Sequence, residues 1–231
     1  MLSHPYVAGV VLAQQNNYGH PEIGGEQYES PEVVKNLVAE IKAVDPKLMV
    51  MIDYEGGPII RLKGVPQEPY IPVLLEGVES FQQEAEAFAL GNRIGAILSY
   101  IGVDVILGPV VDLKYGQIAK RSISTDPNQV VNVASAYIKG LQDHGIQTVL
   151  KHFPGLGGVE SDTHKVRSYA TREFQEGLDV FNRLRQTGSW IMFGHAIYPN
   201  QDTLPASMSA FWHKKGLNFS VSIADDISMG G

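Results

Sequence analysis

The chain has no cysteine among its 231 residues. A disulfide framework and a thiolate-ligated metal site are therefore both excluded. Long apolar runs are missing as well, and no stretch approaches the roughly 18 residues that a membrane-spanning helix needs. Residues 1–7 lack the basic and long apolar regions of a signal peptide. From these absences we expect a soluble, cytoplasmic protein that has no membrane partner.

Positive charge is also in short supply. The 18 lysines and arginines are outnumbered by 25 aspartates and glutamates, which gives a net charge of −7 and a pI near 5.5. A nucleic-acid partner would require a basic face, so none is expected. Apolar residues make up 44% of the chain, enough for a sizeable core, and no repeat or flexible linker divides it. We expect a single domain over residues 1–231.

Short apolar runs alternate with longer amphipathic segments along the whole chain. The expected strands are residues 7–12, 48–52, 103–107, 148–152, 190–193 and 219–224. The expected helices are residues 31–44, 81–101, 127–142, 172–185 and 207–215. Ser30 and Asp126, each followed by proline, are typical helix caps, and Thr171 is expected to cap the fourth helix. Strands that alternate with helices predict βαβ units and a parallel sheet.

Polar side chains follow five of the six expected strands at their C-terminal ends. These side chains are Asp53 and Glu55, Asp112, Lys151 and His152, His195, and Asp225 and Asp226. In a TIM barrel this end of the strands carries the chemistry, whereas a doubly wound sheet gathers polar residues at one switch point. The pattern therefore predicts an α/β fold of the TIM (β/α)8 type. Since only six strands are evident, we expect an incomplete barrel.

The loop after the fourth expected strand holds the most informative residues. Lys151 and His152 end that strand, directly after its apolar run at residues 148–150, and charge in such a place requires a reason. Asp162 and His164 lie two positions apart, so the carboxylate can fix the tautomer of the imidazole and raise its basicity. The imidazole can then both give and take a proton near neutral pH. Asp225 can act as a nucleophile or as a charge stabiliser.

Cationic donors complete this set of groups. These donors can form hydrogen bonds to hydroxyls, an amide carbonyl or a carboxylate. They are Arg61, Arg121, Lys151 and His152. Together with an acid/base imidazole and an isolated carboxylate, these donors fit the transfer of a glycosyl group to water.

Simpler interpretations exist for several of these residues. An Asp-x-His sequence such as residues 162–164 is often no more than a hydrogen bond within a loop. Asp226 can cap a following helix, and residues 55–58 can be a plain turn. His195 fits a buried histidine whose hydrogen bonds are satisfied better than it fits a ligand.

A zinc site is the chemical alternative. Four residues at one barrel mouth could ligate the ion and leave a position open for water. They are His152, His164, His195 and Asp225. Against this, the chain has no H-E-x-x-H motif, and Lys151 beside the ligands would oppose a cation.

These residues, in this order, resemble glycoside hydrolase family 3, and within it the bacterial β-N-acetylglucosaminidases of peptidoglycan recycling. Residues 151–157 resemble the family's K-H-F-P-G-H-G, and residues 162–164 match the D-S/T-H that follows. Residues 51–62 resemble its D-x-E-G-G-R-V-x-R-L. Further similar stretches are residues 104–112, 121–127, 195–199, 205–207 and 223–229. Together they cover almost the whole chain.

The resemblance implies a TIM-barrel-like domain that removes terminal β-GlcNAc from peptidoglycan-derived fragments (muropeptides) with retention of configuration. Asp225 would attack the anomeric carbon, His164 would serve as acid and base, and Asp162 would orient His164. This differs from the usual pair of carboxylates in retaining glycosidases. No metal ion and no organic cofactor is implied. The sugar and its N-acetyl group would be held by Asp53, Arg61, Arg121, Lys151 and His152.

The chain also departs from the family pattern. Leu156 stands where the family has histidine, Gly158 where it has aspartate, and Pro58 where it has arginine. The family's first and last strands are not evident, and an unclosed barrel leaves exposed strand edges and an open core. The alternative function is therefore a catalytically impaired sugar-binding or structural remnant of the same fold. Self-association through the open edges is a further expectation. The sequence leaves three points open. They are the natural aglycone, the preference for GlcNAc or GalNAc, and whether water or phosphate accepts the glycosyl group.

Overall fold

The computed structural model describes residues 7–12, 29–163, 165–171 and 174–229. Six strands form one parallel sheet, and two more form a separate antiparallel hairpin. The strands of the sheet are β1 (Gly9–Leu12), β2 (Met49–Ile52), β5 (Val105–Ile106), β6 (Gln147–Phe153), β7 (Trp190–Phe193) and β8 (Ser222–Ala224). The strands of the hairpin are β3 (Tyr54–Gly56) and β4 (Ile59–Ile60).

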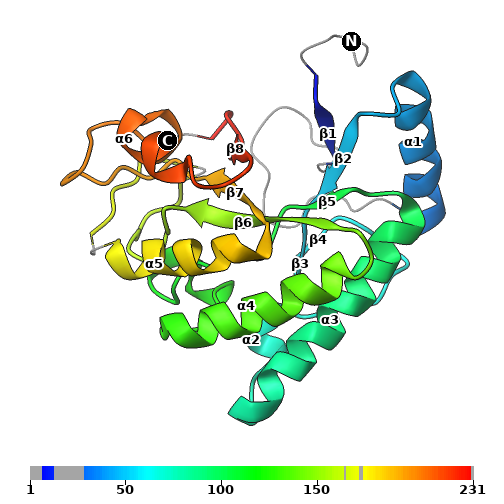
Figure 1. Ribbon diagram of the computed structural model, residues 1–231, viewed down its shortest axis with the longest axis horizontal. Helices are drawn as coiled ribbons and strands as arrows, with labels where there is room; N and C mark the ends of the chain where they lie inside the picture. Colours follow the sequence, from blue (N-terminus) through cyan, green and yellow to red (C-terminus); the bar gives the residue numbers. More distant parts are fainter. Residues whose placement is uncertain (1–6, 13–28, 164, 172–173, 230–231) are drawn as a thin grey trace.

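The order of the strands in the sheet follows their order in the chain, β1-β2-β5-β6-β7-β8. A doubly wound sheet would reverse direction at a switch point, and this sheet does not. Figure 1 shows that the sheet curls, with β1 and β8 at the two ends of the curve. The sheet is thus a half-barrel, and the predicted incomplete TIM-type barrel is confirmed.

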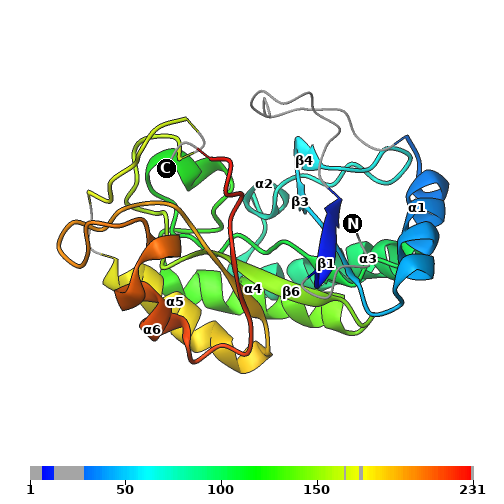
Figure 2. The same cartoon turned by 90° about the horizontal axis from the view of Figure 1, so that it is seen from above.

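Helices connect successive strands of the sheet and cover its outer face. They are α1 (Pro31–Val44), α2 (Ile71–Leu74), α3 (Ser80–Ile101), α4 (Pro127–Gln142), α5 (Gln175–Leu184) and α6 (Ala210–Gly216). Short 3-10 helices are η1 (Gly116–Lys120), η2 (Arg185–Thr187) and η3 (Ala206–Met208). Figures 1 and 2 show α3, α4 and α5 along the outer side of the curve. None of the helices in the described ranges has the length and apolarity needed to cross a membrane.

Two helix starts follow directly from their capping residues. The Ser30 hydroxyl accepts the N–H of Val33 at 3.3 Å, and the Asp126 carboxylate accepts the N–H of Asn128 at 2.9 Å. In both α1 and α4, proline occupies the first turn, where its missing N–H costs nothing. These two predicted boundaries are confirmed.

Two other predicted boundaries are wrong. The Thr171 hydroxyl does not cap a helix but donates to the Gly158 carbonyl at 2.9 Å, and α5 begins only at Gln175. The helix expected from residue 207 is divided into η3 and α6, because the Ser209 side chain accepts an N–H at the start of α6 and caps it there. In the first case the hydroxyl bonds across a loop, and in the second a cap two residues inside the expected helix sets its start.

The alternation of side chains along the strands produces two apolar cores. The main core lies between the sheet and the helices, and includes Val50, Leu150 and Ile191. The opposite, concave face of the sheet carries a smaller cluster, called here the inner cluster. Its buried members are Met51, Val105, Leu107, Val149 and Met192.

The inner cluster bears on the expectation of an open core. Its buried members are at most 8% exposed, so the expectation is wrong for the central strands. The expectation of exposed edges holds, because β1 and β8 each pair with a single neighbour among the described residues. Val11 of the edge strand β1 is 47% exposed.

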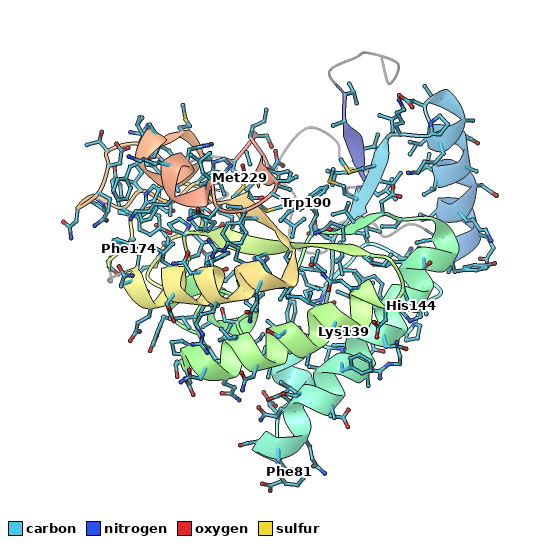
Figure 3. All side chains as sticks on the ribbon, in the orientation of Figure 1. Phe81, Lys139, His144, Phe174, Trp190 and Met229 are labelled. Atoms are coloured by element: carbon cyan, nitrogen blue, oxygen red, sulfur yellow. The ribbon has the colours of Figure 1, made fainter. Side chains whose placement is uncertain are left out.

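Glycines allow α3 and α4 to pack very closely. A Cβ atom at Gly91 of α3 would lie 2.2 Å from the carbonyl oxygen of Tyr137, and one at Gly140 of α4 would lie 2.4 Å from that of Phe88. His144, just past α4, lies against α3 at the other end of this contact, and Figure 3 labels it. Backbone therefore meets backbone where any side chain would force the helices apart.

Candidate active site

Polar side chains gather at the C-terminal ends of the strands, at one end of the half-barrel. Lys151 continues the inward face of β6 two residues after Val149, and Asp53 stands two residues after Met51 of β2. Lys151 is only 3% exposed, although lysine is almost never buried without partners. The inner cluster thus forms an apolar floor beneath a polar layer.

Glu55, in β3, lies at the centre of an ion-pair network. Its carboxylate accepts two hydrogen bonds from Arg121, with Nε–Oε2 at 2.8 Å and Nη2–Oε1 at 2.7 Å. Oε1 also lies 2.5 Å from Nζ of Lys151, and this ammonium donates to Oδ1 of Asp53 at 2.8 Å. The Glu55 and Lys151 side chains are each 4% exposed. The network joins parts of the site that are up to 98 residues apart in the chain.

The charges of this network sustain one another against burial. Burial raises the pKa of Glu55, but Arg121 and Lys151 outweigh it and hold that pKa well below its usual value. Burial lowers the pKa of Lys151, yet Asp53 and Glu55 raise it above the usual value. The pKa of Arg121 is also raised, because Glu55 outweighs the effect of burial. The site therefore presents fixed cations to a ligand near neutral pH.

Arg61, just past the β3–β4 hairpin, extends the cationic side of the site. Its Nη2 lies 3.9 Å from Oδ2 of Asp53. Its Nε is buried, and no hydrogen-bond partner for it exists among the described residues. The side chain as a whole is 16% exposed, and the accessible part of the guanidinium suits a carbonyl, hydroxyl or carboxylate oxygen of a ligand.

His152 lies between two carboxylates. Its Nδ1 is 2.8 Å from Oδ2 of Asp112, and its Nε2 is 3.9 Å from Oδ2 of Asp225. Burial raises the pKa of Asp225, but His152, the backbone N–H of Asp226 and Lys151 lower it, and the result lies below the usual value. Asp225 is therefore an anion near neutral pH, at the end of β8, with 18% of its side chain exposed.

Most of the predicted site residues meet in this polar layer. They are Asp53, Arg61, Arg121, Lys151, His152 and Asp225. Asp162 lies on the loop after β6, where its backbone carbonyl accepts the N–H groups of Lys165 and Val166 at 3.0 and 3.1 Å. His164 lies outside the described residues. The convergence of residues 164 and 225 on one bond therefore stays a prediction.

The loop that carries Asp162 folds back on the protein beside a cavity. The Tyr198 hydroxyl donates to the Gly155 carbonyl at 2.7 Å, and Val159 forms a β-bridge with Ala170. The cavity has a volume of about 330 Å³, and Tyr115, Tyr198 and the glycine backbone of the loop line part of it. One side of the loop therefore borders this cavity.

The sequence allows two interpretations of His195, which follows β7. The ring is 7% exposed, with Nδ1 at 2.7 Å from Oγ of Ser207 and Nε2 at 3.0 Å from the carbonyl oxygen of Asp226. A carbonyl only accepts, so Nε2 carries the proton and Nδ1 accepts from the hydroxyl. The interpretation as a satisfied buried histidine is confirmed. The contact also ties the loop after β7 to the segment after β8.

Sequence reasoning placed Glu55 and Asp112 at strand ends without including either in the site. Glu55 was open to interpretation as part of a plain turn, but it belongs to a hairpin and to the buried ion-pair network. Asp112 is fully buried and binds His152. The signal that could have found both is a carboxylate next to a buried strand, which requires a cation or several donors to accompany it.

The zinc alternative required four residues to surround one ion. Over the part of the chain that the structure describes, which leaves out His164, no group of three or more histidines and carboxylates is placed to hold a metal ion. His195 has both ring nitrogens occupied by Ser207 and Asp226, and Nδ1 of His152 faces Asp112. These contacts do not suit ligation of a metal by His195.

Comparisons by family model, by sequence and by structure all indicate the same family. The model of the glycosyl hydrolase family 3 N-terminal domain matches residues 1–231. A β-hexosaminidase of Hydrogenovibrio crunogenus is 34% identical across 99% of this chain. Native NagZ from Neisseria gonorrhoeae superposes with a TM-score of 0.82 at 31% identity, over 99% of this chain and 68% of that one. A complex of the same neisserial protein with N-trifluoroacetyl-D-glucosamine gives a TM-score of 0.78 at 32% identity, over 91% and 62%.

The match does not extend over the full length of these relatives. The chain spans 66% of the length of the H. crunogenus protein.

Proposed function

Because this chain belongs to glycosyl hydrolase family 3, we propose that it is a glycosidase that releases terminal β-N-acetylglucosamine. Relatives named β-hexosaminidase support this activity, as does a structural neighbour bound to an N-acylated glucosamine. The observation that carries the proposal is the polar layer, in which Arg121, Lys151 and His152 stand as donors beside the anionic Asp225.

The proposed reaction proceeds with retention of configuration. The Asp225 carboxylate attacks the anomeric carbon and forms an ester bond to the sugar, while the bond to the leaving oxygen breaks and that oxygen takes a proton from His164. His164 then removes a proton from water, the water oxygen attacks the same carbon, and Asp225 leaves as a carboxylate. Asp162 orients His164 in both steps. The lowered pKa of Asp225 supports the role of nucleophile, because it keeps the attacking group ionised.

The donors of the polar layer hold the sugar in this proposal. Lys151 and Arg121 keep their positions through Glu55, so each presents a fixed N–H toward hydroxyl or carbonyl oxygens. Asp53 accepts from a hydroxyl, and the accessible part of the Arg61 guanidinium suits the N-acetyl carbonyl. Fixed donors lose little entropy when they bind a ligand, which favours a small, precisely oriented sugar.

The finer details of the substrate are also proposals. We propose a peptidoglycan-derived muropeptide as the natural substrate and the cytoplasm as the place of action. Both rest on the resemblance of the sequence to recycling enzymes. Water as the acceptor belongs to the same proposal.

Contact between copies of the chain is a further proposal. The edge strands β1 and β8 each pair on one side only within the described residues, and Val11 of β1 is 47% exposed. An exposed strand edge is a template for pairing with another chain.

An assay with aryl β-glycosides tests the proposed activity. The chain should hydrolyse an aryl β-GlcNAc faster than the matched aryl β-glucoside, and Asp225→Ala should abolish turnover while the variant still binds GlcNAc. Asp226→Asn is the matched control, because its exposed side chain only accepts from Ser228 and an amide can do the same. Undiminished turnover in Asp225→Ala would remove the nucleophile assignment. Binding of GlcNAc without turnover by the unmutated chain would support the sugar-binding remnant instead.

A further inference from the structure

One carboxylate beside the site makes all of its contacts inside the protein. Asp112, at the end of the segment that follows β5, is fully buried. Its Oδ1 accepts the backbone N–H of Leu156 at 2.6 Å, and its Oδ2 lies 2.8 Å from Nδ1 of His152. The backbone N–H of His152 lies 3.2 Å from each oxygen. Burying a charge is costly unless donors surround it, and here three donors do.

The contact with His152 fixes the state of the imidazole. A carboxylate only accepts hydrogen bonds, so Nδ1 of His152 carries a proton. The ring then directs Nε2 toward Asp225, at 3.9 Å from its Oδ2. That separation is too long for a hydrogen bond. Asp112 therefore settles which nitrogen of His152 faces the ligand and the proposed nucleophile.

The contact with Leu156 reaches the loop that carries Asp162. Leu156 lies four residues after His152, and its own N–H is held by the same carboxylate. Leu156 also stands where the resembling family has histidine. Because the backbone makes this contact, it does not depend on which side chain occupies position 156. One buried acid thus holds both the end of β6 and the first turn of the loop.

We propose that Asp112 is a positioning residue for the proposed glycosidase reaction, fixing His152 with Nε2 toward Asp225 and holding the first turn of the Asp162 loop. The inference rests on the proposed function, because the reaction gives this arrangement its purpose. Asp112 is enclosed and acts on the sugar only through His152 and the loop. Carboxylates that orient a functional histidine in this way are worth about 10- to 100-fold in activity where they have been removed from metal sites.

A double-mutant cycle measures whether Asp112 acts through His152. Asp112→Asn should lower kcat for an aryl β-GlcNAc by about 10- to 100-fold. In a His152→Ala background the same substitution should change kcat much less, since the group that it positions is gone. An equal loss in both backgrounds would overturn the proposal, because it would show that Asp112 does not act by positioning His152.

Asp104→Asn is the matched control. Asp104 lies directly before β5, at the opposite end of that strand from Asp112, and its carboxylate accepts from the Lys42 ammonium at 2.6 Å and from the Val50 N–H at 2.7 Å. It is a structural acid with a similar set of partners and no contact with the polar layer. Asp104→Asn should lower the Tm while kcat and KM stay as in the unmutated chain.

A spectroscopic measurement keeps the proposal testable even where the chain is inactive or Asp112→Asn does not fold. Nitrogen-15 spectra of the imidazole rings, assigned by comparison with His152→Ala, should show a protonated Nδ1 on His152 at about pH 7. An unprotonated Nδ1 in the unmutated protein would overturn the proposal. A protonated Nδ1 in a chain without turnover would support the placement of His152 while removing the proposed function.

Discussion

Glu55 is the residue on which the positive charges of the site converge. It pairs with Arg121 through two hydrogen bonds and with Lys151 through a third contact, and it contacts solvent with only 4% of its side chain. Removing one partner from a buried ion pair is far more costly than removing the whole pair, because a charge is left without compensation. Arg121 and Lys151 would be the charges left behind.

Glu55→Gln should therefore destabilise the protein by about 3–5 kcal/mol at neutral pH. The effect should depend on pH in a defined direction. The folded pKa of Glu55 is lowered, so its contribution is complete above the unfolded value of about 4.3 and is lost as the pH falls through the folded pKa. Urea unfolding should thus show a smaller difference between unmutated chain and variant at about pH 3 than at about pH 7.

Asp143→Asn is the control for this experiment. Asp143 pairs with Lys139 on the surface of α4, where the lysine side chain is 64% exposed. Exposed pairs contribute about 0–1 kcal/mol, so this variant should unfold almost as the unmutated chain does. A loss for Glu55→Gln as small as that of the control would contradict the role given to the network.

Some residues of the site could be predicted from the sequence, and others could not. Lys151 was found from the sequence because a cation beside a buried strand is unusual, and Arg121 was found as a cationic donor within a stretch that resembles the family pattern. Glu55 and Asp112 were not included, because their importance depends on which cations and N–H groups meet them in space. That meeting depends on strand register and loop paths, and sequence spacing does not contain them.

At the scale of elements, the contact between α3 and α4 depends on two glycines. The missing side chains let the Tyr137 and Phe88 carbonyl oxygens approach Gly91 and Gly140 to distances that no Cβ atom tolerates. Gly91→Ala and Gly140→Ala should each lower the Tm, even though alanine favours a helix by about 1 kcal/mol over glycine. The helices must separate to admit the methyl group, and thermal unfolding followed by circular dichroism measures the loss.

Gly177→Ala in α5 is the matched control for these two variants. A Cβ atom there would meet the Pro154 carbonyl oxygen at 3.4 Å and Gly155 at 3.6 Å, which are ordinary contact distances. The helix-favouring effect of alanine should then appear, and the Tm should be unchanged or raised. If Gly91→Ala behaves like Gly177→Ala, the close contact between α3 and α4 is not a source of stability.

Elements with a local signal were predicted well. Ser30 and Asp126 fixed the starts of α1 and α4 because a cap requires only its own neighbours in the chain. Thr171 has the same capping chemistry, but its hydroxyl binds Gly158 across the loop. The start of α5 therefore depends on a tertiary contact, and the local sequence contains no pattern that predicts this contact. The single domain predicted over residues 1–231 stays a prediction.

At the scale of the whole molecule, the open edges of the half-barrel are the surfaces through which we propose that copies of the chain meet. Val11→Lys places a charge on the exposed edge strand β1 and should reduce any self-association, since a charged edge resists pairing with another strand. Light scattering after size-exclusion chromatography, over a range of concentrations, gives the mass. Val33→Lys adds the same charge to α1, at a valine that is 44% exposed, and should leave the mass unchanged. A monomer at all concentrations of the unmutated chain would rule out pairing through these edges.

The strand order of the sheet has a consequence for synthesis on the ribosome. Each strand of the sheet pairs with the sheet strand that was synthesised just before it. The sheet can therefore grow in the direction of translation without waiting for a distant partner. Asp53 follows β2, the second strand of the sheet, whereas Asp225 follows β8, the sixth. A nascent chain would therefore hold the proposed sugar-binding residue Asp53 long before it holds the proposed nucleophile, and the proposed chemistry could begin only after β8 has been made.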